Sequence, residues 1–214
     1  MNAEQPMEQG DYQAALGILV QETSGATVDP ARLLMRFSAE VRLQQFPAAM
    51  QTMQRLIGAA PELAAPMSAF GAAAQAEAAV AQRYRDPGVA GRRAAFGPPP
   101  PYAMALVQAA VSHAQGDAAG ARAAIAQAAS MTPPISGTLT RHGGSTQRFT
   151  AFTDSDELTG ATLIAYDGPN PLDLSLSELI SISFAPPKTT FDVMWPQAEI
   201  VTVTGMTLRV RVPA

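Results

Sequence analysis

Residues that could carry out catalysis are sparse in this chain of 214 residues. It contains two histidines, His113 and His142, and no cysteine. A zinc site built from histidine and cysteine is therefore excluded, and few residues could serve as a catalytic nucleophile or as its general base. Neither a Gly-x-Ser-x-Gly turn nor a His-Glu-x-x-His helix is present. The sequence thus predicts a protein that is not an enzyme and that binds no cofactor and no metal ion.

Acidic residues are the remaining candidates for chemistry. Asp154 with Asp156, or Asp167 with Asp173, could in principle do acid–base work if the fold placed them across a cleft. Asp154, Asp156 and Glu157 could instead collect calcium, but their loop lacks the glycine and the distal glutamate of an EF-hand. We interpret this segment as an Asx-turn between strands.

Composition narrows the class of protein further. The net charge is −4, charged residues make up 15% of the chain, and the pI is about 5.1. Such a balance gives no broad basic surface for nucleic acid. No stretch approaches the roughly 20 apolar residues that cross a bilayer, and the first residues lack the pattern of a signal peptide. We expect a cytoplasmic protein without membrane insertion, which the absence of cysteine also favours.

The elements that must position these residues begin with a repeated phrase. The segment Gly10–Leu16 recurs with several substitutions as Gln44–Met50, so that Phe46 lies 34 residues after Tyr12. A third copy starts at Gly116-Asp117. That spacing is typical of tetratricopeptide (TPR) repeats, in which two antiparallel helices meet at a small turn. Stacked hairpins of this kind form a surface that holds other polypeptides.

Apolar residues at helical spacing support this interpretation before residue 132. The predicted helices cover about 12–19, 34–41, 50–57, 66–84, 103–115 and 117–130. Asp86-Pro87-Gly88 ends the longest of them, and Phe96–Pro101 predicts an extended bridge. The prolines of that bridge could also serve as a polyproline ligand, although rigid spacing between helices is the commoner use.

After residue 132 the composition changes to Thr, Ser, Val, Ile and Phe, which favour strands. The predicted strands are Gln147–Thr153, Ala161–Tyr166, Leu172–Leu176, Leu179–Phe184, Glu199–Thr204 and Thr207–Val212. The glycine-rich segment Arg141–Thr146 could cradle a phosphate, but it lacks the Gly-Lys-Ser/Thr ending and is interpreted as linker. Trp195 is interpreted as a packing anchor, with an exposed interface hot spot as the alternative.

These observations predict an α+β chain of two domains. A TPR-like α–α superhelix is expected at 1–132, a linker at 133–146, and a small antiparallel β barrel or sheet at 147–214.

Several phrases in this order resemble the ImpE/SciE/TagJ family of accessory proteins of the bacterial type VI secretion system. The segments that carry the resemblance are Gly10–Leu16, Phe96–Pro99 leading to Ala105-Leu106, Gly116-Asp117, Gly137–Leu139, Asp154–Asp156, Leu179–Ile182 and Val193–Pro196. The chain departs from the family pattern at Pro171–Leu176, where an aromatic-rich strand is expected, and at Tyr102-Ala103, where tryptophan is common. A divergent member is indicated.

The resemblance implies an adaptor without catalytic activity. Its expected partner is the N-terminal helix of the small contractile-sheath subunit (TssB-like), and its expected role is to modulate sheath handling by the ClpV ATPase. An amphipathic helix of this kind can lay its apolar face into a groove. The alternative is a general TPR-type cochaperone that binds extended peptides.

The positions of the residues within each repeat indicate which of them would contact the partner. The first helix of each hairpin lines the inner side of a superhelix, which selects Leu34, Ser38, Val41 and Arg42 from one repeat and Leu106, Ala110 and His113 from another. The apolar members of this set could merely pack between helices. Ser38, Arg42 and His113 are therefore the favoured contacts.

Overall fold

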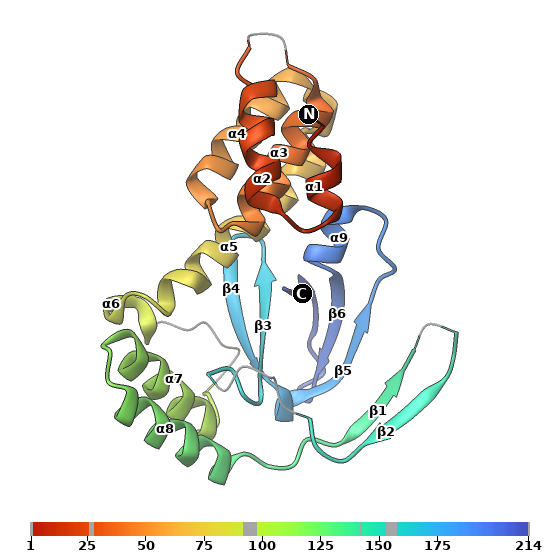
Figure 1. Cartoon of the computed structure of the whole chain (residues 1–214). Helices are drawn as coiled ribbons and strands as arrows, with labels where there is room; N and C mark the ends of the chain where they lie inside the picture. Colours follow the sequence, from red (N-terminus) through yellow and green to blue (C-terminus); the bar gives the residue numbers. More distant parts are fainter. Residues whose placement is uncertain (1, 26–27, 92–97, 142, 153–157, 214) are drawn as a thin grey trace. The chain divides into compact units, whose positions relative to one another are not determined.

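The structure is a computed structural model that describes residues 2–25, 28–91, 98–141, 143–152 and 158–213. Helices occupy the first part of the chain and antiparallel strands the last part (Figure 1). The predicted α+β class is confirmed. Some predicted features lie outside the described residues, namely Phe96-Gly97, His142, Asp154, Asp156 and Glu157.

The chain divides into two compact units, residues 1–78 and 79–214, which we call unit 1 and unit 2. Their boundary falls inside α5 (Ala64–Arg83) and not near residue 132, where the composition changes. Composition reports local preference for helix or strand, whereas a compact unit is defined by the elements that share a core. Two of the later helices share their core with strand residues, as described below, and therefore belong to unit 2.

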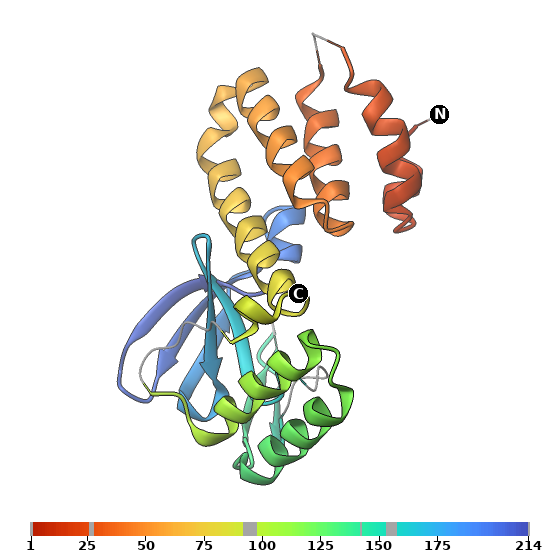
Figure 2. The ribbon, with the colours of Figure 1, turned by 90° about the vertical axis from the view of Figure 1, so that its left-hand side faces the viewer.

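Unit 1 is built from helices that stand side by side (Figure 2). They are α1 (Glu4–Glu8), α2 (Tyr12–Glu22), α3 (Pro30–Arg42), α4 (Phe46–Ala59), the 3₁₀ turn η1 (Pro61–Leu63) and the first part of α5. Side-chain caps start two of them, because Asp11 accepts the N–H of Ala14 and Asp29 accepts the N–H of Ala31. Ala15, Leu16 and Leu19 are buried, as the helical spacing predicts.

The same turn joins the helices of each predicted hairpin. Gly10, Gln44 and Gly116 have φ of 75°, 56° and 78°, and Gly116 joins α7 (Pro101–Ala114) to α8 (Ala118–Met131) in unit 2. At each turn the N–H of the positive-φ residue donates to the carbonyl three residues earlier. The N–H of the next residue donates to the carbonyl five residues before it. This is the Schellman arrangement, and it satisfies carbonyls at the end of the first helix. The predicted repeat positions are confirmed as equivalent turns.

Gln44 holds a backbone conformation that costs a non-glycine residue about 1–2 kcal/mol. We predict that Gln44→Gly raises the free energy of unfolding by about 1 kcal/mol, since glycine adopts this φ without strain. Chemical denaturation of the two proteins checks the value. The neighbouring Gln45→Gly, at a residue with φ of −86°, is expected to give no gain. Equal effects at the two positions would contradict the assignment of strain to Gln44.

Unit 2 contains an antiparallel sheet with strand order β4-β3-β7-β6-β5. The strands are β3 (Thr162–Asp167), β4 (Asn170–Ser175), β5 (Leu179–Phe184), β6 (Gln197–Thr202) and β7 (Thr207–Arg211). Each overlaps a predicted strand. In the part of the chain that the structure describes, β4 and β5 remain the two edges and do not pair, so the barrel alternative is wrong and the sheet alternative is confirmed. The core on one face consists of Ala165, Leu172, Leu174, Ala198, Ile200, Val210 and Val212.

Helices α7 and α8 share a buried apolar cluster with residues of this sheet region. Tyr102, Ala105 and Leu106 of α7 form one buried cluster with Ala128 of α8 and with Leu176, the residue that follows β4. Unit 2 also contains the one-turn helix α6 (Pro87–Ala90), which begins where the sequence predicted the end of the long helix.

A second, two-stranded sheet lies in the segment that the sequence assigned to a linker. Strand β1 (Gly137–Thr140) pairs with β2 (Thr146–Phe149). Two backbone hydrogen bonds close the turn between them: the N–H of Arg141 donates to the carbonyl of Ser145, and the N–H of Gly144 donates to the carbonyl of Arg141. The linker prediction for 133–146 is thus wrong over most of its length, because Gly143 and Gly144 supply positive φ for a hairpin turn. Both N–H groups are engaged inside the turn, which disfavours phosphate binding there.

The short helix α9 (Thr190–Met194) is fixed by a capping box. Burial alone would raise the pKa of the Asp192 carboxyl, but hydrogen bonds from Thr189, the Lys188 N–H and Arg211 outweigh it and hold that pKa below its usual value. The residue after the helix, Trp195, is buried, so the packing interpretation of this side chain is confirmed. Its carbonyl accepts a hydrogen bond from Arg211 at 2.7 Å.

Among the described helices, none combines the length and the apolar character that crossing a membrane requires.

Candidate functional site

The structure places most of the predicted partner-binding residues inside the protein. In α3, Ser38 and Val41 are buried, Leu34 is half-buried, and Arg42 is exposed. Side chains on the face of α3 that packs against its neighbours cannot reach a partner unless helices separate. Ser38 and Val41 are therefore withdrawn from the candidate surface, whereas Arg42 stays on it.

The same separation holds in α7. Leu106 and Ala110 are buried, and His113 is exposed. Leu106 belongs to the cluster with Leu176, so its role is packing. Helix α3 lies in unit 1 and α7 lies in unit 2, so the two groups of candidates are described separately. His113 remains a candidate contact in unit 2.

The arginines of α3 differ in how their charge is compensated. Arg32 lies 3.4 Å from Glu4 and 3.5 Å from Glu22, and Arg36 lies 2.7 Å from the buried Glu40. Arg42 instead has its guanidinium 5.8 Å from the ring centre of Tyr12. Of these three cations, Arg42 is the one that the described residues do not pair with a carboxylate.

The acidic pair in the sheet does not form a catalytic dyad. Asp173 is buried and its Oδ2 accepts a hydrogen bond from Arg83 Nη1 at 2.8 Å. Asp167 is exposed at the turn and is paired in the ladder with Asn170, whereas Asp173 is paired with Ile164. The Asp173 carboxylate is thus engaged by the Arg83 guanidinium. Asp167 and Asp173 therefore do not form an arrangement for proton transfer. Within the described ranges, no group of His, Asp and Glu has metal-binding geometry.

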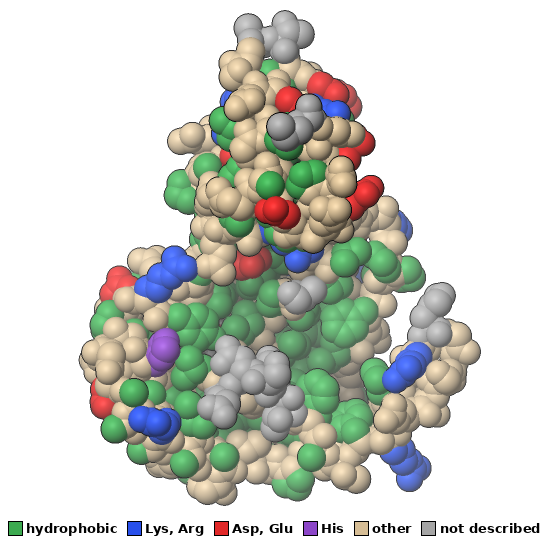
Figure 3. All heavy atoms as spheres, in the orientation of Figure 1, with side chains coloured by type: hydrophobic (Ala, Val, Ile, Leu, Met, Phe, Trp, Pro, Cys, Tyr) green, Lys and Arg blue, Asp and Glu red, His purple; other side chains and the backbone are tan. Residues whose placement is uncertain are grey.

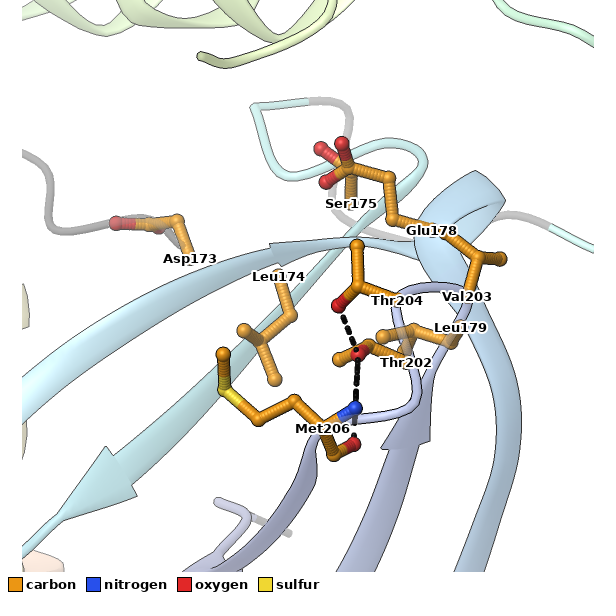
Figure 4. A pocket seen from close by; sticks show the side chains of 9 residues that line it. All are labelled: Asp173, Leu174, Ser175, Glu178, Leu179, Thr202, Val203, Thr204 and Met206. Carbon is orange, nitrogen blue, oxygen red and sulfur yellow. Dashed lines mark hydrogen bonds between the residues drawn. The ribbon is translucent and has the colours of Figure 1, made fainter. Parts of the chain in front are cut away.

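One pocket of unit 2 offers a defined cavity. It has a volume of about 350 Å³ and lies between the end of β4 and the turn that joins β6 to β7 (Figure 4). We call it the β6–β7 pocket. Its lining consists of Asp173, Leu174, Ser175, Glu178, Leu179, Thr202, Val203, Thr204 and Met206.

The turn on one side of this pocket satisfies its own polar groups. The hydroxyls of Thr202 and Thr204 lie 2.9 Å apart, and the N–H of Met206 donates to Thr202 Oγ1 at 3.1 Å. Gly205 has φ of 81° and donates its N–H to the carbonyl of Thr202. The Val203 N–H donates to the carbonyl of Glu178 at 2.9 Å, which ties the turn to the 3₁₀ segment η2 (Leu176–Glu178). The walls of the pocket are consequently held by backbone hydrogen bonds.

Apolar side chains are exposed around this part of unit 2. Val203 and Met206 are large apolar residues next to the turn between β6 and β7, and they are 58% and 41% exposed. Ile180 and Phe184 of the edge strand β5 are also exposed. Figure 3 shows hydrophobic side chains gathered in a hollow over the sheet, with charged side chains mainly at its margin. A contiguous exposed apolar patch is typical of a surface that binds another protein.

The sequence did not predict the β6–β7 pocket. Glu178 lies in a short segment between two predicted strands, and Val203 and Thr204 were predicted as the end of the strand Glu199–Thr204, whereas β6 ends at Thr202. The signal that could have found it is the pair of large apolar residues Val203 and Met206 on either side of the turn residue Gly205, where polar residues are usual. The Arg83–Asp173 pair had no local signal, because the two residues are 90 positions apart.

A helical first part and an antiparallel sheet define the class of this protein as α+β. No protein-family model matches the sequence, and no curated protein is similar to it. Among solved structures, the chain is similar to the crystal structure of protein VPA1032 from Vibrio parahaemolyticus, with a TM-score of 0.83 and 14% identity. The alignment covers 99% of this chain and 77% of that protein. At this identity the likeness shows a shared fold.

Proposed function

We propose that this protein is a non-enzymatic adaptor of a bacterial type VI secretion system, a divergent member of the ImpE/SciE/TagJ family that acts in the cytoplasm. Its partner is the N-terminal helix of the small sheath subunit, and through it the protein modulates sheath handling by the ClpV ATPase. The α-helical part is a TPR-like repeat region and the sheet is a small accessory domain.

The observation that carries this proposal is the equivalence of the helical hairpins. Gly10, Gln44 and Gly116 make the same turn with the same hydrogen bonds. Five residues after each of them stands a buried alanine, Ala15, Ala49 or Ala121. A small buried residue at a fixed place lets the two helices of a hairpin approach closely, which is typical of helical-repeat proteins that bind polypeptides.

The contacts that support partner binding are the exposed members of the predicted set. Arg42 in unit 1 and His113 in unit 2 both lie in the last turn of the first helix of a hairpin. An amphipathic partner helix that lays apolar side chains on the protein surface would offer carboxylates along its polar margin to such groups.

The alternative, a general TPR-type cochaperone, gains no support from these observations. Capture of a peptide carboxylate needs several cations without partners on one face. Of the three arginines of α3, Arg32 and Arg36 are already engaged by carboxylates of the protein itself, which leaves Arg42 on that helix.

Calorimetry with a synthetic peptide tests the proposal. The peptide is the N-terminal helix of the small sheath subunit from the genome that encodes this chain. We expect saturable binding, and we expect the double variant Arg42→Ala/His113→Ala to weaken it about tenfold, which corresponds to about 1.4 kcal/mol.

Arg122→Ala is the matched control, since Arg122 is exposed on α8, the other helix of a hairpin, and donates only to the carbonyl of Ala118. This variant should bind like the parent protein. Absence of binding to the sheath helix, together with absence of sheath and ClpV genes near the coding gene, would overturn the proposed function. Binding that the double variant leaves unchanged would overturn the assignment of its two residues.

A further inference from the structure

We propose that the β6–β7 pocket is a peptide-docking site that accepts one lysine or arginine side chain flanked by apolar residues. The inference concerns the sheet of unit 2 and does not depend on the identity of the partner or on type VI secretion. It rests on the charge of the pocket, the nature of its walls and the residues exposed at its rim.

The charge of the pocket selects a cation. Among the described residues, its lining includes the acidic residues Asp173 and Glu178 and no lysine, arginine or histidine. Asp173 is compensated by Arg83, and Figure 4 shows its side chain directed away from Leu174 and Met206. The carboxylate of Glu178 makes no hydrogen bond or ion pair with the described residues. Within the described part of the chain, Glu178 therefore supplies one uncompensated negative charge beside the cavity.

The apolar walls of the pocket favour a ligand whose charged group is carried on an apolar chain. Leu174, Leu179 and Met206 supply apolar surface, and the hydroxyls of Thr202 and Thr204 are engaged within the turn. Lysine and arginine bury their methylene chains on such surface while the charged head meets a carboxylate. A neutral ligand would cover Glu178 without pairing it, which costs free energy, and an anion would be repelled. A volume of about 350 Å³ suits a single side chain better than a large cofactor.

The rim indicates that the cation belongs to a peptide and is not a free amine. Val203 and Met206 are exposed beside the opening. The hydrogen bond from the Val203 N–H to the Glu178 carbonyl keeps this rim next to the carboxylate. Apolar residues on either side of the bound lysine or arginine would cover these two side chains, which a small amine cannot do.

NMR titration of the full chain, labelled with ¹⁵N, tests the site. The probes are acetyl-Leu-Lys-Leu-amide, the same tripeptide with norleucine in place of lysine, and n-butylammonium. We expect the lysine peptide to shift the amide signals of residues 174–179 and 202–206, and to bind about five- to tenfold more tightly than the norleucine peptide. Butylammonium should bind more weakly than the lysine peptide, since it leaves the rim exposed.

Two variants separate the parts of the site without threatening the fold. Glu178→Gln should remove the preference for lysine over norleucine, and Val203→Ser, at an exposed residue, should weaken the peptides but not butylammonium. Glu199→Gln is the control, because Glu199 lies on the same sheet but pairs with Arg209. Equal binding of the lysine and norleucine peptides, or shifts away from the pocket, would overturn the proposal. Butylammonium binding as tight as the lysine peptide would overturn its peptide component.

Discussion

Replacing Asp173 by alanine is expected to lower the free energy of unfolding of unit 2 by about 3–5 kcal/mol, because the change leaves a buried guanidinium without its carboxylate. Asp173 and Arg83 are 2.8 Å apart, and their side chains are 7% and 9% exposed. In this setting water cannot replace the missing partner. Urea unfolding followed by the fluorescence of Trp195, the one tryptophan of the chain, measures the loss.

A surface ion pair of the same sheet provides the matched control for this prediction. Arg209 and Glu199 are exposed and 3.4 Å apart, so Glu199→Ala should cost less than about 1 kcal/mol. The double variant Arg83→Leu/Asp173→Leu should recover most of the stability that Asp173→Ala loses, because it removes both charges. A cost below about 1 kcal/mol for Asp173→Ala would show that solvent reaches this pair and would contradict the burial described here.

Local patterns predicted much of this fold because they act over a few residues. The sequence located the turns at Gly10, Gln44 and Gly116 because a short phrase recurs there, its first two copies at the spacing of a helical hairpin. The sheet strands were located by β-forming runs between turn residues. These signals depend on neighbours in the chain and not on the tertiary fold.

Features that depend on tertiary contacts were not predicted in the same way. Within the predicted strand Leu179–Phe184, Ile180, Ile182 and Phe184 alternate with small residues, a pattern typical of a half-buried strand, yet Ile180 and Phe184 are exposed. The physical reasons are that β5 is an edge strand and that its register shifts between Leu179 and Ser181. The sequence cannot show which strand lies at an edge, since this depends on the order of all five.

The candidate site follows the same division. The sequence correctly placed Arg42 and His113 near hairpin turns, but it could not show that Ser38 and Val41 are buried. Equivalent positions of a repeat differ in burial when the neighbouring elements differ. Glu178 became a candidate only when the turn after β6 was seen beside it.

Replacing Trp195 by alanine is expected to destabilise unit 2 by about 3–5 kcal/mol, as large-to-small changes at buried aromatic residues do. Trp195 is 1% exposed, and its carbonyl and N–H are held by Arg211 and Phe191. The loss is measured by circular dichroism during urea unfolding, since the variant lacks the fluorescent residue.

Val193, two residues earlier and 55% exposed, provides the control for Trp195. Val193→Ala should change stability by no more than about 0.5 kcal/mol, because its side chain has little packing to lose. A packing anchor and an interface hot spot differ in which measurement responds. If Trp195→Ala left the unfolding free energy unchanged but abolished binding of the sheath helix, the side chain would have to reach the partner directly. Its burial argues for the opposite result, with stability lost in the free protein before any partner is added.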